Sequence, residues 1–297
     1  MTVRPEQQLS LLEESEEPAF VDRRPKFRAF SNRVWSKAKS QLIEKYLYYF
    51  VLITRHGTYI DGFSGPQYSN ELDKWSAKRV LESRPRWLRH FFFCELNAAS
   101  VKKLEHMVAG QAPRVPKKEP KRDVRVIAGD FNIQYESILN SGVIRDKEAT
   151  FCLLDQRTFE CHWATVEAIA RHKPAGRRIE LLYFLPIKWL KRALAAQSDK
   201  AVIERWWGRS DWHILQDCSN DGIREQFVKR FDELGYAHVS AWPIYSWISG
   251  QQVMYYMIQA TDHPDAPKIM FRAYKRVVTP NVIEQLPLGL ESVEFED

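Results

Sequence analysis

TYIDGFSGP, residues 58–66, reads as a buried strand that runs directly into a glycine turn. A second apolar strand is predicted at 90–94, and it is followed by Glu95 and Asn97. In an open parallel sheet, ligands bind beyond the carboxyl ends of the strands. There a glycine turn lets the backbone approach a cofactor, and an acid on the next strand holds a ribose. The two segments therefore predict a site for a cofactor that contains a nucleoside.

The composition is that of one globular domain with basic clusters. The chain has 297 residues and a formal net charge of +6, and its basic residues gather at 26–45, 114–125 and 188–209. We expect a loose acidic arm at 1–25, one main domain at 26–280 and an acidic tail at 281–297. There is no long apolar run and no signal-peptide pattern, which predicts a cytoplasmic protein without membrane contact. The four cysteines show no CxxC spacing, so we expect reduced and mostly buried thiols.

Strand-like and helix-like segments alternate from residue 58 to residue 185. This spacing is typical of right-handed crossover units that build a parallel sheet. An amphipathic helix is expected before them, capped by Ser31 and ended by Gly57. The predicted strands are 58–61, 90–94, 124–128, 150–154 and 179–185, and the predicted helices are 31–50, 73–83, 98–109, 132–140 and 161–172.

The last third of the chain has a different pattern. Two strand-like runs, 237–246 and 252–260, flank Ile248-Ser249-Gly250, which is a hairpin signal. Residues 187–235 are helical in pattern and rich in tryptophan. The sequence thus predicts an α/β fold in which a parallel sheet is closed by a C-terminal antiparallel hairpin, with a helical insertion at 187–235.

Each of four crossover strands delivers an acid to the same edge of the predicted sheet. Glu95 is placed to accept hydrogen bonds from two ribose hydroxyls, and Asp130 from an adenine amino group while Phe131 packs on the ring. Asp61 stands just before Gly62, where it would repel a pyrophosphate but attract a sulfonium or ammonium group. This favours S-adenosylmethionine over a dinucleotide, with Asp61, Gly62, Phe63, Gly65, Glu95, Asn97, Asp130 and Phe131 as the predicted cofactor-binding residues.

Four segments together resemble the three-Cys-motif partner proteins of bacteria and phages. They are YIDGFSGP at 59–66, ELN at 95–97, GDFN at 129–132 and LDQRTFECHW at 154–163. The likeness spans roughly residues 35–275. It implies a Rossmann-like class I methyltransferase fold with a seven-stranded sheet, and a partnership with a separate protein that carries the three cysteines. The cysteines of this chain do not form that motif.

The segment after the fourth predicted strand is the expected acceptor site. Amino-group methyltransferases of nucleic acid place [DNS]-P-P-[YF] there, and the aromatic ring stacks on a flipped base. Here the acid and an aromatic are kept and both prolines are missing. The net positive charge favours nucleic acid or a nucleotide-like molecule as the acceptor. The candidate catalytic residues are Asp155, Gln156, Arg157, Phe159 and Trp163.

Each candidate has a chemical role and some have a plainer alternative. Asp155 is expected to orient or deprotonate the acceptor, and Gln156 to read an amide or a base edge. Arg157 is expected to hold a phosphate or carboxylate, or else to pair with Glu160. Trp163 either stacks on a substrate ring or fills the core.

The Trp-rich insertion is the expected substrate-recognition element. Its tryptophans could stack on nucleobases while neighbouring cations meet phosphates, although at least half of them are expected in the core. The tryptophans are Trp189, Trp206, Trp207 and Trp212, and the cations are Lys188, Lys191, Arg192, Arg205 and Arg209.

Other functions remain open at this point. The missing second glycine, with Gln67 in its place, and the missing prolines favour a non-catalytic module that docks a partner protein or DNA. A nuclease that places the four strand-end acids around magnesium lacks an associated lysine motif. A zinc site of Cys152, Cys161 and His162 lacks a four-ligand spacing.

Overall fold

The computed structural model describes residues 38–66, 74–115, 119–246 and 252–278. The predicted arm at 1–25, the tail at 281–297, the helix cap at Ser31, the hairpin turn at 248–250 and Gln67 lie outside these ranges.

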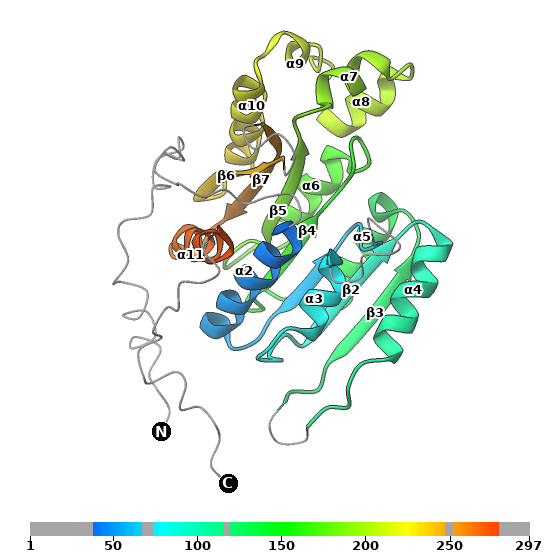
Figure 1. Ribbon diagram of the computed structural model, residues 1–297, viewed down its shortest axis with the longest axis vertical. Helices are drawn as coiled ribbons and strands as arrows, with labels where there is room; N and C mark the ends of the chain where they lie inside the picture. Colours follow the sequence, from blue (N-terminus) through cyan, green and yellow to red (C-terminus); the bar gives the residue numbers. More distant parts are fainter. Residues whose placement is uncertain (1–37, 67–73, 116–118, 247–251, 279–297) are drawn as a thin grey trace.

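A seven-stranded sheet organises the molecule (Figure 1). Its spatial order is β3-β2-β1-β4-β5-β7-β6, and the first five strands are mutually parallel, whereas β7 is antiparallel to both of its neighbours. The predicted α/β, mostly parallel, Rossmann-like architecture with a C-terminal antiparallel pair is therefore confirmed. The strands are β1 Thr58–Asp61, β2 His90–Glu95, β3 Asp123–Ala128, β4 Thr150–Leu154, β5 Glu180–Pro186, β6 His238–Tyr245 and β7 Val253–Thr261.

Helices cover both faces of the sheet, and each face has its own apolar core. Strand residues alternate between the two cores, as the two-residue period of a strand requires. On β1, for example, Tyr59 belongs to one core and Ile60 to the other. Helices α2 (Lys39–Thr54), α3 (Ser76–Glu82), α4 (Ala98–Ala109) and α11 (Ala266–Val278) pack with the Tyr59 core. Helices α5 (Phe131–Leu139), α6 (Trp163–Arg171), α8 (Lys200–Trp207) and α10 (Asn220–Glu233) pack with the Ile60 core.

The remaining helices lie in the predicted insertion. Residues 187–235 contain α7 (Leu190–Ala196) and α9 (Ile214–Asp217) together with α8 and α10. Figure 1 shows α7, α8 and α9 at one end of the molecule, beyond the end of β5. The expected helical insertion is thus present, and the sheet resumes with β6 after it.

Two features of the helices differ from the sequence-based expectation. Helix α2 ends at Thr54, and Arg55 takes the left-handed C-cap conformation with φ 61°, so the stop precedes Gly57. Its N–H bonds the carbonyl of Val51, which closes the last turn. Helix α11 was not expected, although Ile269, Met270 and Ala273 supply a buried stripe at helical spacing.

Candidate functional site at the carboxyl ends of the strands

The glycine turn after β1 is held against both neighbouring strands. The Gly62 N–H bonds the Leu153 carbonyl of β4 at 3.0 Å, and the Ser64 N–H bonds the Cys94 carbonyl of β2 at 2.9 Å. A Cβ at Gly62 would lie 2.8 Å from the ring of Phe131. The turn therefore needs glycine because the first helix after β3 packs directly against it.

Glu95 reaches the same turn from β2. Its Oε2 accepts the Gly65 N–H at 2.6 Å, and its Oε1 accepts the Asn97 N–H at 2.8 Å. A Cβ at Gly65 would lie 2.3 Å from Glu95 Oε2, so only glycine permits this contact. The structure thus joins the glycine turn to the end of β2 through the Glu95 side chain as well as through the Cys94 carbonyl.

Asp61 is a buried acid with an unusual proton affinity. It is 2% exposed, and its carboxylate accepts the Tyr59 hydroxyl at 3.1 Å and the Phe63 N–H at 3.2 Å. Burial, followed by the charge of Asp155 on the neighbouring strand end, raises the pKa of Asp61 to about 7. A cation placed beside Asp61 would favour its ionised form and relieve this cost.

Lys39 is the site residue that the sequence analysis missed. It lies in the first turn of α2, and its Nζ donates to Asp155 at 2.9 Å (Oδ1) and 2.7 Å (Oδ2). The two side chains are 7% and 10% exposed, and the ammonium also lies 4.3 Å from the ring centroid of Phe184. Burial raises the pKa of Asp155, and the charge of Lys39 opposes that shift.

Asp130, Phe131 and Asn97 have structural work at the ends of β2 and β3. Asn97 caps α4 by accepting the Ser100 N–H at 3.0 Å, and Asp130 caps α5 by accepting the Asn132 N–H at 2.9 Å. Phe131 is 2% exposed and contacts Phe63 edge to face. Its ring packs against Gly62 of the glycine turn, and its burial leaves no open face for an adenine.

The segment after β4 is fixed by its own side chains. Gln156 is 3% exposed; its Oε1 accepts the Cys161 N–H at 2.9 Å and its Nε2 donates to the Phe184 carbonyl at 3.4 Å. The predicted base-reading role of Gln156 is thus replaced by a role in shaping the loop. Glu160 accepts the backbone N–H of Arg157 at 2.7 Å, while the Arg157 side chain is exposed.

The aromatic candidates divide between core and surface. Trp163 is 2% exposed, donates to Glu167 at 3.0 Å, and lies under the guanidinium of Arg230, so the core alternative holds for it. Phe159 is half-buried and meets Trp206 edge to face with centroids 5.0 Å apart. Trp206 and Trp207 are buried, whereas Trp189 and Trp212 are partly exposed. The insertion therefore packs on the acceptor loop through its buried half.

The cations that the sequence places near these tryptophans lie at the surface. Lys188, Lys191, Arg192, Arg205 and Arg209 are all exposed, and Arg209 pairs with Glu233 at 2.5 Å.

The thiols are free and largely buried. Cys94 and Cys152 lie in strands, Cys161 lies in the loop before α6, and Cys218 is half-buried between α9 and α10. Within the described ranges, no group of three or more His, Cys, Asp or Glu side chains is arranged to hold a metal ion. No helix in those ranges is long and apolar enough to cross a membrane.

A cavity of about 360 Å³ lies at the other end of the parallel strands, where β4 and β5 begin. Its lining includes Tyr46 of α2, Glu180 of β5 and Ile269 of α11. Burial raises the pKa of Glu180 to about 7, although its carboxylate accepts hydrogen bonds from Tyr46, Gln259 and Thr261. None of the predicted site residues lines this cavity.

Comparison with known proteins yields matches among solved structures alone. No family model and no curated protein matches the chain. Among solved structures, the chain is similar to protein LPL1258 from Legionella pneumophila str. Philadelphia 1, of family model DUF519. The two are 11% identical, with a TM-score of 0.44, over 85% of this chain and 95% of the other. A likeness of this degree transfers no function to the chain.

Proposed function

We propose that this chain is an S-adenosylmethionine-dependent methyltransferase whose acceptor is a nucleic acid or a nucleotide-like molecule. One observation carries the proposal: acids from neighbouring strand ends converge on one glycine turn. Glu95 bonds Gly65, Asp61 is electrostatically coupled to Asp155, and Phe131 packs under Gly62. Strand ends of an open α/β sheet are where such folds bind nucleoside ligands.

The charge and the hydrogen-bonding capacity of this edge fit the cofactor. A nearby cation would stabilise the ionised form of Asp61, and S-adenosylmethionine carries a sulfonium and an ammonium group. Each Glu95 oxygen accepts one backbone N–H and keeps a second lone pair for a ribose hydroxyl. When bound, the cofactor supplies an electrophilic methyl group. The residues of this chain bind and orient it, so that proximity provides much of the rate.

The acceptor would lie against the loop after β4. Lys39 fixes the orientation of Asp155 through two hydrogen bonds, and the free lone pairs of that carboxylate can accept an N–H of the acceptor. The exposed Arg157 beside it suits a phosphate. We place the partner protein with the three cysteines in the same proposal, since it rests on the resemblance of the four segments.

Calorimetry with S-adenosylmethionine tests the proposal directly. Wild-type protein is expected to bind the cofactor, and Glu95→Lys to lose binding because a cation replaces the ribose acceptor. Glu105→Lys is the matched control, since Glu105 is exposed on α4 and makes the same charge change. Absence of wild-type binding at about 1 mM cofactor, weaker than about 4 kcal/mol of binding free energy, would sink the proposal.

A non-catalytic module that docks a partner protein or DNA is the second candidate. It is favoured by the pairing of both Asp155 oxygens with Lys39 and by the structural engagement of Gln156. Under this alternative Glu95→Lys keeps partner binding, and no methyl transfer from labelled cofactor is detected. A magnesium nuclease draws no support from the described acids, which form no metal-binding group.

A further inference from the structure

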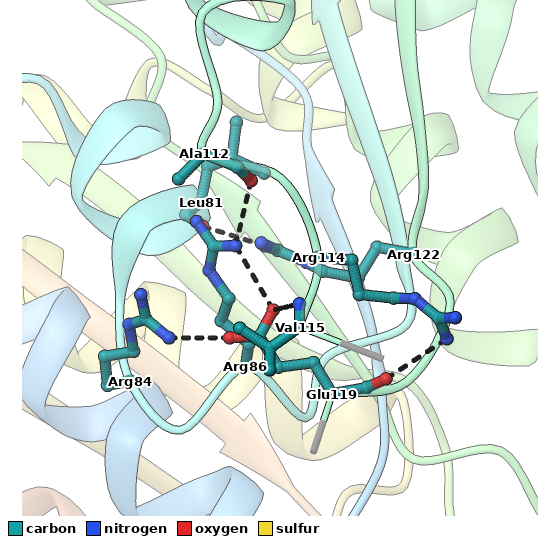
Figure 2. Close-up of polar contacts among 8 residues, drawn as sticks. All are labelled: Leu81, Arg84, Arg86, Ala112, Arg114, Val115, Glu119 and Arg122. Atoms are coloured by element: carbon teal, nitrogen blue, oxygen red, sulfur yellow. Dashed lines mark hydrogen bonds and ion pairs between the residues drawn. The ribbon is translucent and has the colours of Figure 1, made fainter. Parts of the chain in front are cut away.

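A cluster of four arginines lies near the start of β2 and β3, at the opposite end of these strands from the glycine turn. Figure 2 shows the polar contacts of the cluster. Arg84 and Arg86 precede β2, and Arg114 and Arg122 lie in the loop that leads to β3. We call these four residues the arginine cluster. They surround Glu119, whose carboxylate accepts from Arg84 at 2.6 Å and from Arg86 at 3.3 Å.

The other two arginines meet only neutral acceptors among the described residues. Arg114 donates to the carbonyl of Glu119 at 3.3 Å, and Arg122 donates to the carbonyl of Leu81 at 2.8 Å. Arg122 also lies 4.5 Å from the ring centroid of Phe91. A carbonyl satisfies an N–H but leaves the charge uncompensated. Among the described residues of this region, four guanidinium charges are therefore set against the carboxylate of Glu119.

Part of this excess charge is buried. Arg86 is 8% exposed, and the Nε atoms of Arg86 and Arg122 are buried without an acceptor within the described ranges. Burial and the neighbouring charge of Arg86 lower the pKa of Arg122 to about 10. The cluster thus has more donors and more positive charge than the described residues satisfy, which is the condition under which an external anion gains most.

A structural lock explains only part of the cluster. Glu119 with Arg84 and Arg86 is sufficient to hold the loop against the α3–β2 connection, and the Val115 N–H adds a bond to Glu119 at 3.4 Å. The third and fourth arginines, Arg114 and Arg122, add bonds to backbone carbonyls, which do not require a cation. The side chain of Arg84 is 66% exposed and Arg114 is exposed, so both can reach a ligand.

We propose that the arginine cluster binds phosphodiester groups of a nucleic acid, with Arg84 and Arg114 as the contacting residues. Planar guanidinium groups match pairs of phosphate oxygens, and phosphate contacts fix the position of a nucleic acid without reading its sequence. The proposal extends the proposed function, since it gives the acceptor a second contact away from the methyl-transfer edge. Strands β2 and β3 separate the two edges by roughly 20 Å. A strand stacked as in a duplex, at roughly 3.4 Å for each nucleotide, spans this distance with about 6 nucleotides.

Salt-dependent binding of fluorescent single-stranded DNA and RNA of about 20 nucleotides, and of the DNA duplex, tests the site. Arg84→Gln and Arg114→Gln are each expected to reduce the slope of log affinity against log salt by about 0.7 on single strands. Near 0.1 M salt this corresponds to roughly five-fold weaker binding. The three probes show which form of nucleic acid carries the contact.

Arg171→Gln is the matched control. Its side chain is also 66% exposed and faces one carboxylate, Glu167, at 3.8 Å, so the variant makes the same change in net charge. It is expected to leave both slope and affinity unchanged. The site is refuted if Arg84→Gln and Arg114→Gln keep wild-type binding, or if Arg171→Gln weakens binding equally.

Glu119→Gln separates the site from the lock. Loss of the one carboxylate is expected to tighten nucleic-acid binding and to lower the melting temperature, whereas a lock alone predicts only the lower melting temperature. Cofactor calorimetry on the same variants keeps the two proposals apart. If Arg84→Gln retains cofactor binding and its nucleic-acid binding is unchanged, only the proposal for the arginine cluster is overturned. If the wild type does not bind the cofactor and Arg84→Gln binds nucleic acid more weakly than the wild type, the methyltransferase proposal is overturned and the arginine cluster is supported.

Discussion

Lys39 and Asp155 form a buried ion pair whose worth depends on both partners. Lys39→Met removes two hydrogen bonds and leaves a buried carboxylate unpaired, so we expect the free energy of unfolding to fall by about 3 kcal/mol. Asp155→Asn is expected to lower the free energy of unfolding by a similar amount, because it leaves the buried ammonium of Lys39 without a carboxylate partner. Lys39→Met with Asp155→Asn should cost far less than the sum, since no buried charge remains. Denaturant unfolding of the four proteins measures this, and additive losses would show that the pair is not coupled.

Asp61 makes cofactor affinity depend on pH. Its pKa of about 7 means that it is largely protonated at pH 6 and largely ionised at pH 8. A cationic cofactor binds the ionised form of Asp61. Its affinity should therefore rise by up to about ten-fold for each unit by which the pH is raised toward 7, and it should level off above pH 7. Asp61→Asn should bind weakly and with little pH dependence. Calorimetry across this range contradicts the role if the wild-type affinity is flat.

The glycine turn is sensitive to single methyl groups. Gly65→Ala would place a Cβ 2.3 Å from Glu95 Oε2, which forces the carboxylate away from the Gly65 N–H. We expect a loss of about 1–3 kcal/mol in stability, with weaker cofactor binding. Gly110→Ala is the control, because its nearest atom would be 3.4 Å away and its φ of −78° suits alanine. Equal melting temperatures for both variants would show that the turn tolerates the shift.

The elements of the sheet were predictable because each carries its own local signal. The strands of 58–61 and 150–154 were predicted with the observed bounds, since apolar runs there end at turn residues or acids. Helix α11 was not predicted, although its buried stripe has helical spacing. Lys39 was missed as well. It belongs to the basic run of residues 26–45, and nothing local indicates a partner 116 residues later.

The predicted acids reached one end of the sheet as expected, whereas Phe131 and Trp163 are buried rather than open to a ligand. Strand register fixes where Asp61 and Glu95 lie, and that follows from the parallel order. Whether a ring such as Phe131 or Trp163 faces a ligand or the core depends on the packing of helices distant in sequence. A single sequence does not encode that distinction in a local pattern.

Buried acids give the whole molecule an unusual dependence of stability on pH. The pKa of Glu180 is raised from 4.5 to about 7, so between these values the folded chain holds a proton that the unfolded chain has lost. Raising the pH through this window therefore favours unfolding, by up to about 3 kcal/mol for this group. Asp61 adds to the same trend. Denaturant unfolding from about pH 4.5 to pH 8 measures the slope.

Glu180→Gln should flatten this slope, since it keeps one acceptor oxygen and cannot ionise. Glu225→Gln is the control, because the Glu225 side chain is 60% exposed and should not contribute. A wild-type slope that survives in Glu180→Gln would assign the effect to other groups.

The position of β7 has a consequence for how the chain is made. It lies between β5 and β6, although it is the last of the three to leave the ribosome. Until residues 253–261 emerge, β6 has no strand beside it and β5, buried along its whole length, keeps an open edge. Nascent chains that stall after β6 therefore present the unpaired apolar edge of β5 to chaperones and to one another, and synthesis of β7 closes the sheet.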